Sequence, residues 1–316
     1  MSFIEVKDLK VHYPIRGGFF NKIIDYVYAV DGVSFTIEKG KTYGLVGESG
    51  SGKSTIGKAI IGLEKIKSGK IIYEGREIDR KFRNRRSEYN RNVQMIFQDS
   101  LSSLNPKKRV IDLISEPLRN FENLTPDEEK RKVSELLEIV GMNREDIFKY
   151  PHEFSGGQRQ RIGIARALAV DPEVLVCDEP ISALDVSIQA QVVNLLKDLQ
   201  KERNLTLLFI AHDLSMVKYI SDRVAVMYRG KVVELGTPEV VYTNPIHSYT
   251  KSLISAVPIA DPDYKKLAKI DMDESYLRSP MGEASEINVI PEKPELTEFK
   301  PGHFVETLFL EEKGLI

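Results

Sequence analysis

The 316-residue chain contains one cysteine and no tryptophan, and it lacks an apolar run long enough to cross a bilayer. The single cysteine, Cys177, excludes an internal disulfide bond and any metal site made of cysteines alone. The strongest apolar stretch, residues 205–211, is far shorter than the roughly 20 residues that a transmembrane helix needs. The first residues also lack the basic and apolar segments of a signal peptide. We therefore expect a soluble cytoplasmic protein that reaches a membrane through partners.

A large excess of charge of either sign is absent too. Lys and Arg total 45 and Asp and Glu total 47, so the net charge is −2. This balance excludes a protein that binds polyanions with its whole surface, but it leaves room for a local basic patch. Residues 80–91 are strongly basic, and they form either a solvated loop or helix face, or a contact with an acidic partner or a membrane surface.

The pattern of apolar residues predicts an α/β domain. The first 45 residues are rich in strand-type alternation, with a hairpin loop at residues 16–20. Continuous apolar runs at residues 174–177 and 205–210 indicate strands that are buried on both faces of a sheet. Helical spacing is found at residues 53–63, 125–140, 155–169 and 188–199. Because strands alternate with helices, the core of the sheet should be largely parallel.

The sequence changes character after residue 257. Residues 258–316 contain six of the 15 prolines, thirteen acidic side chains and seven basic ones. Apolar periodicity is weak there, so we expect an appendage of turns and short strands that depends in part on contacts for its order. The predicted division is a main domain over residues 1–257 and a C-terminal extension over residues 258–316.

A phosphate-loop pattern lies near the N-terminus. Residues 47–54 read G-E-S-G-S-G-K-S and match G-x-x-x-x-G-K-[ST] in full. Glycines let backbone N–H groups turn toward phosphates, and the helix that follows adds the partial positive charge of its N-terminus. In this pattern Lys53 reaches the β- and γ-phosphates, and the Ser54 hydroxyl binds Mg²⁺. An apolar strand before the loop and an amphipathic helix after it complete the pattern, so we predict a nucleotide site.

A second glycine turn and a pair of carboxylates are candidates for the same site. Residues 155–157, Ser-Gly-Gly, open a predicted helix and form either a second docking point for phosphate oxygens or only a capped helix start. Asp178 and Glu179 follow a predicted buried strand. We expect Asp178 to bind Mg²⁺ opposite Ser54, and Glu179 to accept a proton from an attacking water molecule.

The order of these motifs resembles that of the ATP-binding cassette (ABC) ATPases. The shared strings are the phosphate loop, Gln98, Ser-Gly-Gly-Gln at residues 155–158, Asp-Glu-Pro at 178–180, Ser-Ala-Leu-Asp at 182–185, and His212. The Ser-Gly-Gly-Gln signature separates this family from other phosphate-loop ATPases, although Phe154 stands where the family usually has leucine. The resemblance covers residues 3–260. It implies an ABC-ATPase nucleotide-binding domain with a RecA-like parallel-sheet core, an antiparallel β subdomain, and a helical subdomain at about residues 99–170.

The resemblance also implies a role for each matching residue. Tyr13 matches the aromatic residue that stacks on adenine, and Gln98 matches the glutamine that senses the γ-phosphate and Mg²⁺. The signature and Asp185 match groups that meet ATP bound to an opposing subunit, and His212 matches the histidine at the γ-phosphate. The expected catalytic residues are Lys53, Gln98, Glu179 and His212, and the expected Mg²⁺ ligands are Ser54, Gln98 and Asp178. The expected nucleotide contacts are Tyr13, Gly47, Glu48, Ser49, Gly50, Ser51, Gly52, Lys53, Ser54, Thr55, Ser155, Gly156, Gly157, Gln158 and Asp185.

Four strings resemble the ATPases of the oligopeptide and dipeptide importers. Within that group they are more similar to the F-type subunit than to its D-type companion. They are residues 93–99, 102–106, 150–154 and 183–191. In that group two different ATPases pair beneath two permeases, which an extracytoplasmic binding protein supplies. The resemblance thus implies ATP and Mg²⁺ as cofactors. It implies as partners a D-type ABC ATPase, two transmembrane permeases and a substrate-binding protein, with this chain peripheral on the cytoplasmic face of the cell membrane.

The C-terminal extension departs from the family pattern. Many relatives carry a cysteine cluster there, associated with an iron–sulfur centre. Gly-Glu at residues 282–283 and Gly-His at 302–303 match the flanks of that cluster, yet no cysteine lies between or after them, so we expect no iron–sulfur cluster. Cys177 should be a packing residue, and His303 should be structural or exposed to solvent.

Every element of the active site is present in the sequence. We therefore predict an ATPase that couples ATP hydrolysis to the uptake of oligopeptides or dipeptides, with an oligosaccharide importer of the same branch as the alternative. More distant alternatives are an exporter ATPase and a non-transport ABC ATPase that acts on DNA or ribosomes. The latter usually have a long coiled-coil insertion or a second cassette, which this chain lacks. We expect no nucleic acid among its partners.

Overall fold

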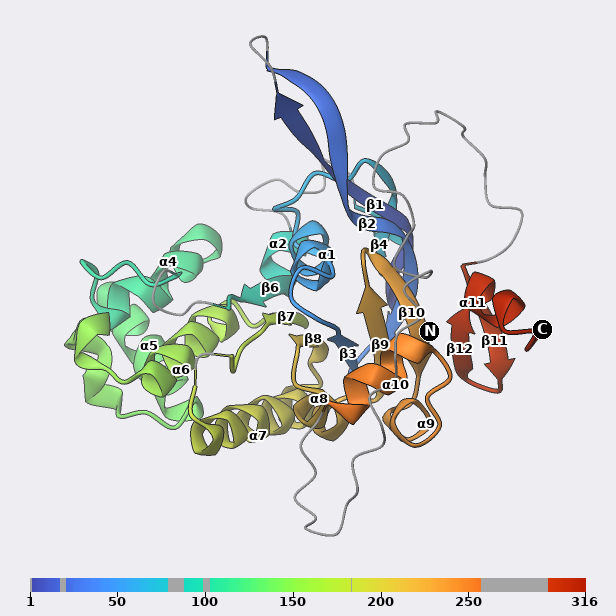
Figure 1. Cartoon of the computed structure of the whole chain (residues 1–316). Helices are drawn as coiled ribbons and strands as arrows, with labels where there is room; N and C mark the ends of the chain where they lie inside the picture. Colours follow the sequence, from blue (N-terminus) through green and yellow to red (C-terminus); the bar gives the residue numbers. More distant parts are fainter. Residues whose placement is uncertain (1, 18–20, 79–87, 99–102, 183, 257–294) are drawn as a thin grey trace.

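The computed structural model describes most of the chain. It covers residues 2–17, 21–78, 88–98, 103–182, 184–256 and 295–316. These segments form an eight-stranded sheet through the middle of the molecule, a four-stranded sheet beside it, and a group of helices at one end (Figure 1). Of the basic stretch at residues 80–91, the structure describes only the last part, which lies in α2 (Glu88–Asn92).

The central sheet is parallel where the sequence predicted parallel strands. β3 (Thr42–Val46) pairs in parallel with β8 (Thr206–Ala211) on one side and β9 (Arg223–Tyr228) on the other. β7 (Val174–Asp178) lies between β8 and β6 (Val93–Ile96), again in parallel. The residues that follow parallel strands meet at one edge of a sheet, where open α/β folds bind their ligands.

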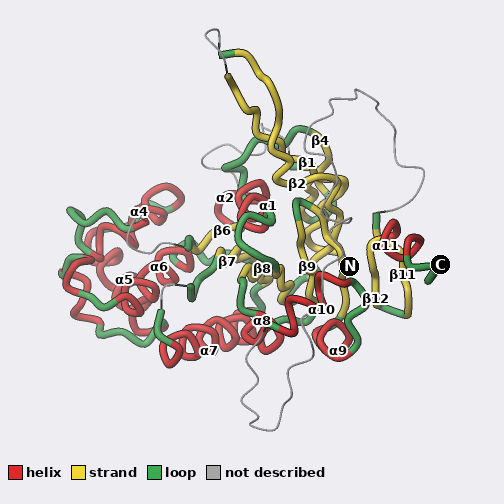
Figure 2. The backbone as a smooth tube through the Cα atoms, in the orientation of Figure 1, coloured by secondary structure: helices red, strands yellow, loops and turns green. Residues whose placement is uncertain are grey.

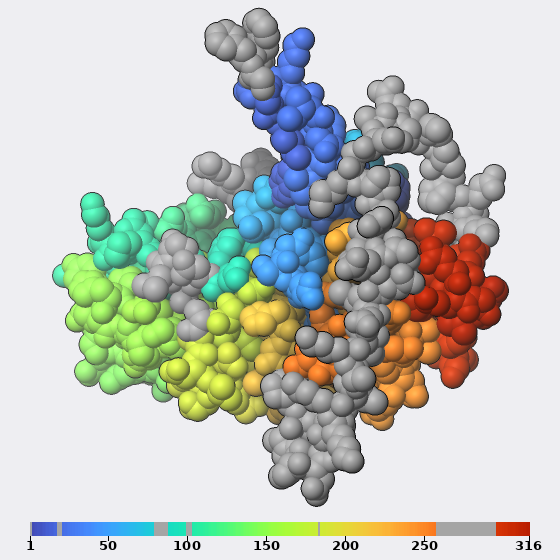
Figure 3. Space-filling model, viewed as in Figure 1, coloured from blue at the N-terminus to red at the C-terminus, as the bar shows by residue number. Residues whose placement is uncertain are grey.

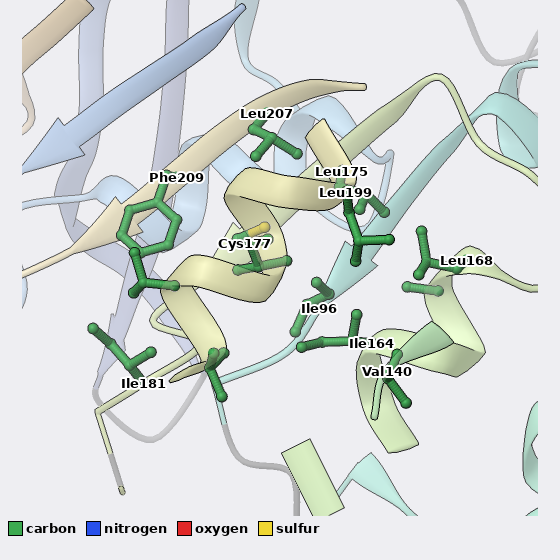
Figure 4. Packing of buried hydrophobic residues seen from close by; sticks show 14 of the residues in the cluster. Ile96, Val140, Ile164, Leu168, Leu175, Cys177, Ile181, Leu199, Leu207 and Phe209 are labelled. Atoms are coloured by element: carbon green, nitrogen blue, oxygen red, sulfur yellow. The ribbon is translucent and has the colours of Figure 1, made fainter. Parts of the chain in front are cut away.

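Alternate residues of the two apolar strands face opposite sides of this sheet. Cys177 and Phe209 belong to one hydrophobic cluster, and Val176 and Ile210 belong to the other. Figure 4 shows Cys177 beside Leu175 among the apolar side chains of the first cluster. Burial raises the pKa of the Cys177 thiol to about 12. Both predictions are confirmed: the strands are buried on two faces, and Cys177 is a packing residue.

Helices cover both faces of the central sheet. α1 (Lys53–Ile60) packs on the face that carries Val176 and Ile210. α7 (Val186–Arg203) and α8 (Leu214–Ile220) pack on the opposite face. α1 ends three residues before the predicted boundary, at a turn in which Gly62 adopts a φ of 82°. Among the described residues, no helix combines the length and the apolar character that a membrane span requires.

The four-stranded sheet is antiparallel and is built mainly by the N-terminus. Its strands are β1 (Ser2–Gly17), β2 (Lys22–Glu38), β4 (Ser68–Tyr73) and β5 (Arg76–Glu77). β1 and β2 run on together beyond the rest of the sheet as a two-stranded ribbon (Figure 1). The loop predicted at residues 16–20 therefore starts too early, because the first two of these residues are paired in the ribbon and the others lie outside the described segments.

A helical region occupies one end of the molecule (Figure 2). It contains α4 (Val110–Phe121), α5 (Pro126–Ile139) and α6 (Gly156–Leu168), with short 3₁₀ turns at Arg144–Phe148 and Pro151–Glu153. The three helices bury their apolar faces against one another in the larger hydrophobic cluster. This region lies within the segment predicted as a helical subdomain.

The start of α5 is stabilised by a side-chain cap. Thr125 and Glu128 form a reciprocal capping box, in which each side chain accepts a hydrogen bond from the other's backbone N–H. We expect Thr125→Ala to lower the free energy of unfolding by about 1 kcal/mol, the usual contribution of such a cap. Denaturant unfolding measures this loss, and Thr125→Ser should restore most of the stability because it keeps the hydroxyl. An equal loss in both variants would contradict the role of the cap.

The C-terminal residues extend the central sheet. β10 (Lys231–Gly236) pairs with β9, β12 (His303–Glu306) pairs with β10, and β11 (Leu296–Lys300) forms the edge, all antiparallel. α11 (Thr307–Glu312) follows β12, and Figure 3 shows this segment in red at one end of the molecule. The short strands expected in the extension are present, and the main domain supports them directly.

Two further helices connect the central sheet to this extension. α9 (Pro238–Thr243) follows β10, and α10 (Ser248–Ser255) begins a few residues later. Each begins with a side-chain cap, from Thr237 and from His247 respectively. Both helices lie close to the C-terminal segment in Figure 1. The cap at Thr237 thus marks the point where the chain leaves β10, and the cap at His247 marks the start of α10.

Glu295 makes the docking of the extension sensitive to pH. Burial is the main cause that raises the pKa of its carboxyl from 4.5 to about 7. The charged groups that face it are Lys231, Asp31, Asp8 and Lys10. Because the pKa is higher in the folded chain, stability from this group is fully present below pH 4.5 and is lost as the pH rises through about 7.

We therefore expect Glu295→Gln to raise the melting temperature at pH 8 and to change it little at pH 4.5. The expected gain is a few degrees, since about 1 kcal/mol shifts the melting temperature of a 150–250-residue domain by about 2–4 °C. Thermal unfolding of the variant and the parent chain across this pH range measures the difference. A difference that is the same at both pH values would contradict the titration of Glu295.

Candidate nucleotide-binding site

The phosphate loop connects β3 to α1 and requires glycine at two positions. Gly47 and Gly52 have φ values of 153° and 104°, in the region that favours glycine. A Cβ atom on Gly47 would lie 2.1 Å from the carbonyl oxygen of Met227, and one on Gly52 would lie 2.0 Å from that of Ala29. These contacts are with backbone atoms that cannot rotate away. The loop is thus pressed against two neighbouring strands.

Lys53 lies buried at the centre of this loop. Its ammonium group donates hydrogen bonds to the carbonyl oxygens of Gly47 (2.8 Å) and Glu48 (2.7 Å), and to the Ser51 hydroxyl (3.2 Å). Burial lowers its pKa, and the nearby carboxylates, of which Glu179 acts most strongly, oppose that change. A buried cation surrounded by inward-turned backbone is suited to a strongly anionic ligand such as a polyphosphate.

Ser54 and Asp178 meet beside Lys53, as the sequence predicted. The Ser54 hydroxyl donates a 2.6 Å hydrogen bond to Oδ1 of Asp178, which is buried at the end of β7. Burial raises the pKa of Asp178, while the bond from Ser54 and the nearby Lys58 lower it. Hydroxyl and carboxylate oxygens are ligands that Mg²⁺ favours, with phosphate and water completing its shell. The described residues contain no cluster of three or more His, Cys, Asp or Glu that could hold a metal by itself.

Two predicted catalytic side chains converge on a third, Glu179, which follows Asp178. The Gln98 amide donates a 2.7 Å hydrogen bond to Oε2 of Glu179, and Nδ1 of His212 lies 3.6 Å from the same oxygen. Gln98, Glu179 and His212 follow β6, β7 and β8, which are neighbours in the parallel sheet. The sheet therefore brings together residues that are up to 114 positions apart.

Glu179 is held in an uncommon backbone conformation. Its φ is 44°, in the left-handed region, and its N–H donates a 2.9 Å hydrogen bond to the carbonyl of Ile210. Its side chain is 12% exposed, whereas that of His212 is 58% exposed. The carboxylate is thus fixed by the backbone and by Gln98 while its surroundings stay open to water and a ligand.

A large cavity adjoins Gln98 on the side of the helical region. It has a volume of about 1030 Å³ and lies between the end of β6 and helices α4 and α6. Its lining includes Gln98, Lys58, Leu113, Glu116 and Arg166. Gln98 therefore bonds Glu179 and also lines the cavity between the central sheet and the helical region.

Tyr13 lies where a ligand on the phosphate loop could reach it. It is on β1, and its ring is partly exposed. Its hydroxyl interacts with Thr55 in the first turn of α1 and with Glu64, which lies beyond the end of that helix. Burial is the main cause that raises its pKa. The structure thus places the predicted adenine-stacking residue next to the end of the phosphate loop.

The signature turn is carried by the helical region. Ser155 is the N-cap of α6, and its hydroxyl and the Gln158 side chain form a reciprocal capping box. A Cβ on Gly157 would lie 2.5 Å from Cγ2 of Ile188 in α7, which follows its N-cap, Asp185. The turn and the start of α7 are therefore packed together. The capped helix start is present, and this geometry is also compatible with a docking point for phosphate oxygens.

One residue at the site was not found from the sequence. The Tyr249 hydroxyl accepts a 2.9 Å hydrogen bond from the Glu48 N–H in the phosphate loop. The two residues are 201 positions apart. No local pattern links them, so only the folded chain shows the contact.

Relatives and solved structures identify the family. Residues 30–182 match the model described as ABC transporter, and residues 233–282 match the oligopeptide/dipeptide transporter, C-terminal region. Oligopeptide transport ATP-binding proteins OppF are similar over most of their length: 55% identical in Bacillus subtilis (96% of this chain, 95% of that one) and 54% in Lactococcus lactis (82% of each). The chain belongs to the ABC transporter family of ATP-binding proteins. Within that family, it has the C-terminal region of the oligopeptide/dipeptide group.

Solved structures support the same assignment. cbiO1 of Clostridium perfringens, part of the ABC transporter complex cbiONQ, is 28% identical over 77% of this chain and 92% of that chain, with a TM-score of 0.65. The dimeric ATP-binding cassette MJ0796, bound to ADP and Pi, is 25% identical over 74% and 98%, with a TM-score of 0.66. The predicted fold class and the predicted ATPase class are confirmed.

Proposed function

We propose that this chain hydrolyses ATP to drive the uptake of oligopeptides or dipeptides through a membrane importer. The observation that carries the proposal is the convergence of Gln98 and His212 on Glu179, next to the Ser54–Asp178 pair. The names of the relatives, oligopeptide transport ATP-binding proteins, favour peptides over oligosaccharides as the transported substrate.

The residues of the site fit ATP and Mg²⁺. The phosphate loop would hold the phosphates with its backbone N–H groups and with Lys53, while Tyr13 would stack on the base. Ser54, Asp178 and Gln98 would hold Mg²⁺, which would supply positive charge to neutralise the phosphates. Glu179 would accept a proton from water, and His212 would stabilise charge on the terminal phosphate.

The signature turn completes the site of a second subunit in this proposal. Ser155, Gly156, Gly157, Gln158 and Asp185 would meet ATP held by a partner ATPase, which we infer to be of the D type. The dimeric state of a solved ATP-binding cassette supports such pairing.

The remaining partners follow from the same group of importers. Two permeases and an extracytoplasmic substrate-binding protein would complete the complex, with this chain peripheral on the cytoplasmic face of the membrane. The cavity beside Gln98 supports transmission of the nucleotide state to the permeases. We also propose the division into a nucleotide-binding domain at residues 1–257 and an extension at residues 258–316.

Identification of the companions tests this proposal. The tagged chain is purified from detergent-solubilised membranes, and the proteins that accompany it are identified by mass spectrometry. Two multi-spanning permeases and a second ABC ATPase are expected, with untagged membranes as the control. Ribosomal or DNA-associated companions without a permease would contradict the transport function. Uptake of labelled peptides and oligosaccharides, with and without the chain, then decides the substrate class.

A further inference from the structure

The C-terminal extension is attached to the main domain through a buried carboxylate. Glu234 of β10 is fully buried, and Nε2 of His303 in β12 lies 2.7 Å from its Oε1. The carboxylate of Glu234 also accepts hydrogen bonds from the backbone N–H groups of Ile246 (2.9 Å) and His247 (3.0 Å). One buried side chain therefore joins the extension to the segment that starts α10.

The extension also contacts the first residues of α10 directly. The His247 ring packs against the Phe309 ring of α11, with 4.4 Å between their centroids, and Nε2 of His247 lies 3.5 Å from a carboxylate oxygen of Glu306. The other ring nitrogen, Nδ1, accepts a 3.1 Å hydrogen bond from the Tyr249 N–H and caps the helix. The start of α10 is thus fixed by groups from β12 and α11.

Tyr249 carries this contact to the phosphate loop. Its ring is buried against the Tyr228 ring, at 4.3 Å between centroids, and its hydroxyl accepts the hydrogen bond from the Glu48 N–H. That N–H belongs to the same peptide unit as the Gly47 carbonyl, to which the Lys53 ammonium donates. Because a peptide unit is planar, fixing its N–H also fixes its carbonyl. Tyr249 and Lys53 therefore hold opposite sides of one peptide.

We propose that Tyr249 is a positioning residue that orients Lys53 through the Gly47–Glu48 peptide, and that the C-terminal extension sets the position of Tyr249. The docked extension then adjusts how tightly the loop binds the β-phosphate of a nucleotide. This inference rests on the proposed function only in the assignment of Lys53 to the phosphates.

Tyr249→Phe tests the first step, because it removes the hydroxyl and keeps the packed ring. The full-length chain is titrated with MgADP and, by competition, with AMP, which has no β-phosphate. We expect ADP affinity to fall about three- to tenfold, the usual effect of one lost hydrogen bond, and AMP affinity to stay unchanged. Tyr73→Phe, which removes a hydroxyl that donates to Glu173 on another part of the molecule, should change neither affinity. A general loss of folding would lower both affinities together, so the ADP-to-AMP ratio isolates positioning.

His303→Ala tests the second step, since it removes the group that bonds Glu234. We expect a loss of ADP affinity in the same direction, and rescue by His303→Gln, whose amide can donate to the carboxylate. In the Tyr249→Phe background, His303→Ala should cause no further loss, because both changes act on the same peptide. If His303→Ala does not fold, Phe309→Leu perturbs the same contact with α10 and replaces it in the cycle.

An unchanged ADP-to-AMP ratio in Tyr249→Phe would overturn the positioning role. Additive losses in the double variant would overturn the link to the extension. Neither result bears on the transport function, because nucleotide binding is measured on this chain without permeases. Conversely, co-purified proteins that contradict the transport function would leave the nucleotide-binding measurements valid.

Discussion

Glu179→Gln is expected to abolish steady-state ATP hydrolysis by the assembled complex while nucleotide binding is retained. The amide keeps the size of the side chain and can still bond Gln98, which lies 2.7 Å from the carboxylate. It cannot accept a proton from the attacking water, and removal of such a base typically costs about 10²–10⁴-fold in rate. The backbone at this position, with its φ of 44° and its bond to Ile210, stays as it is.

Phosphate release by the purified complex measures the effect, and a fluorescent nucleotide measures binding to the same sample. Glu173→Gln is the matched control. Glu173 directly precedes β7, at the end of the strand away from the site, and its carboxylate bonds Tyr73 and Lys39. Turnover should stay normal in this control. Unchanged hydrolysis by Glu179→Gln would remove Glu179 from the catalytic role.

The sequence was sufficient for the parts of the site that depend on local patterns. The phosphate loop, the start of α6 and the two apolar strands were all predicted from short stretches, since their conformations depend on neighbours in the chain. Gln98 and His212 were expected at the site only from the resemblance to the ABC ATPases. The fold brings them to Glu179 because residues after adjacent parallel strands meet at one edge of the sheet.

The C-terminal contacts could not be predicted in the same way. Glu234 and His303 are separated by 69 residues, and each taken alone is an ordinary charged or polar residue. Their pairing depends on β12 adding to β10, which no local pattern encodes. The bond between Tyr249 and Glu48 is the next step along the same set of contacts. The prediction that His303 is either structural or exposed is thus settled by the fold, which buries it.

Gly52→Ala is expected to destabilise the chain severely and to remove nucleotide binding. Gly52 has a φ of 104°, and an added Cβ would lie 2.0 Å from the Ala29 carbonyl oxygen and 2.7 Å from Cε of Met227. The Met227 side chain can move, but the carbonyl belongs to β2 and cannot move without disturbing its pairing with β1. We expect a loss of more than about 4 kcal/mol in the free energy of unfolding, a range reached only by severe steric or backbone conflicts.

Gly75→Ala separates the two causes of this loss. Gly75 also has a positive φ, 76°, but an added Cβ there meets nothing within 4 Å. It should cost only about 1–2 kcal/mol, the penalty for an L-residue in the left-handed region. Denaturant unfolding of both variants compares them directly, and titration with MgADP measures binding in any Gly52→Ala protein that folds. Similar losses in the two variants would mean that β2 yields to the new methyl group, and that the phosphate loop is less tightly pressed against it than the structure indicates.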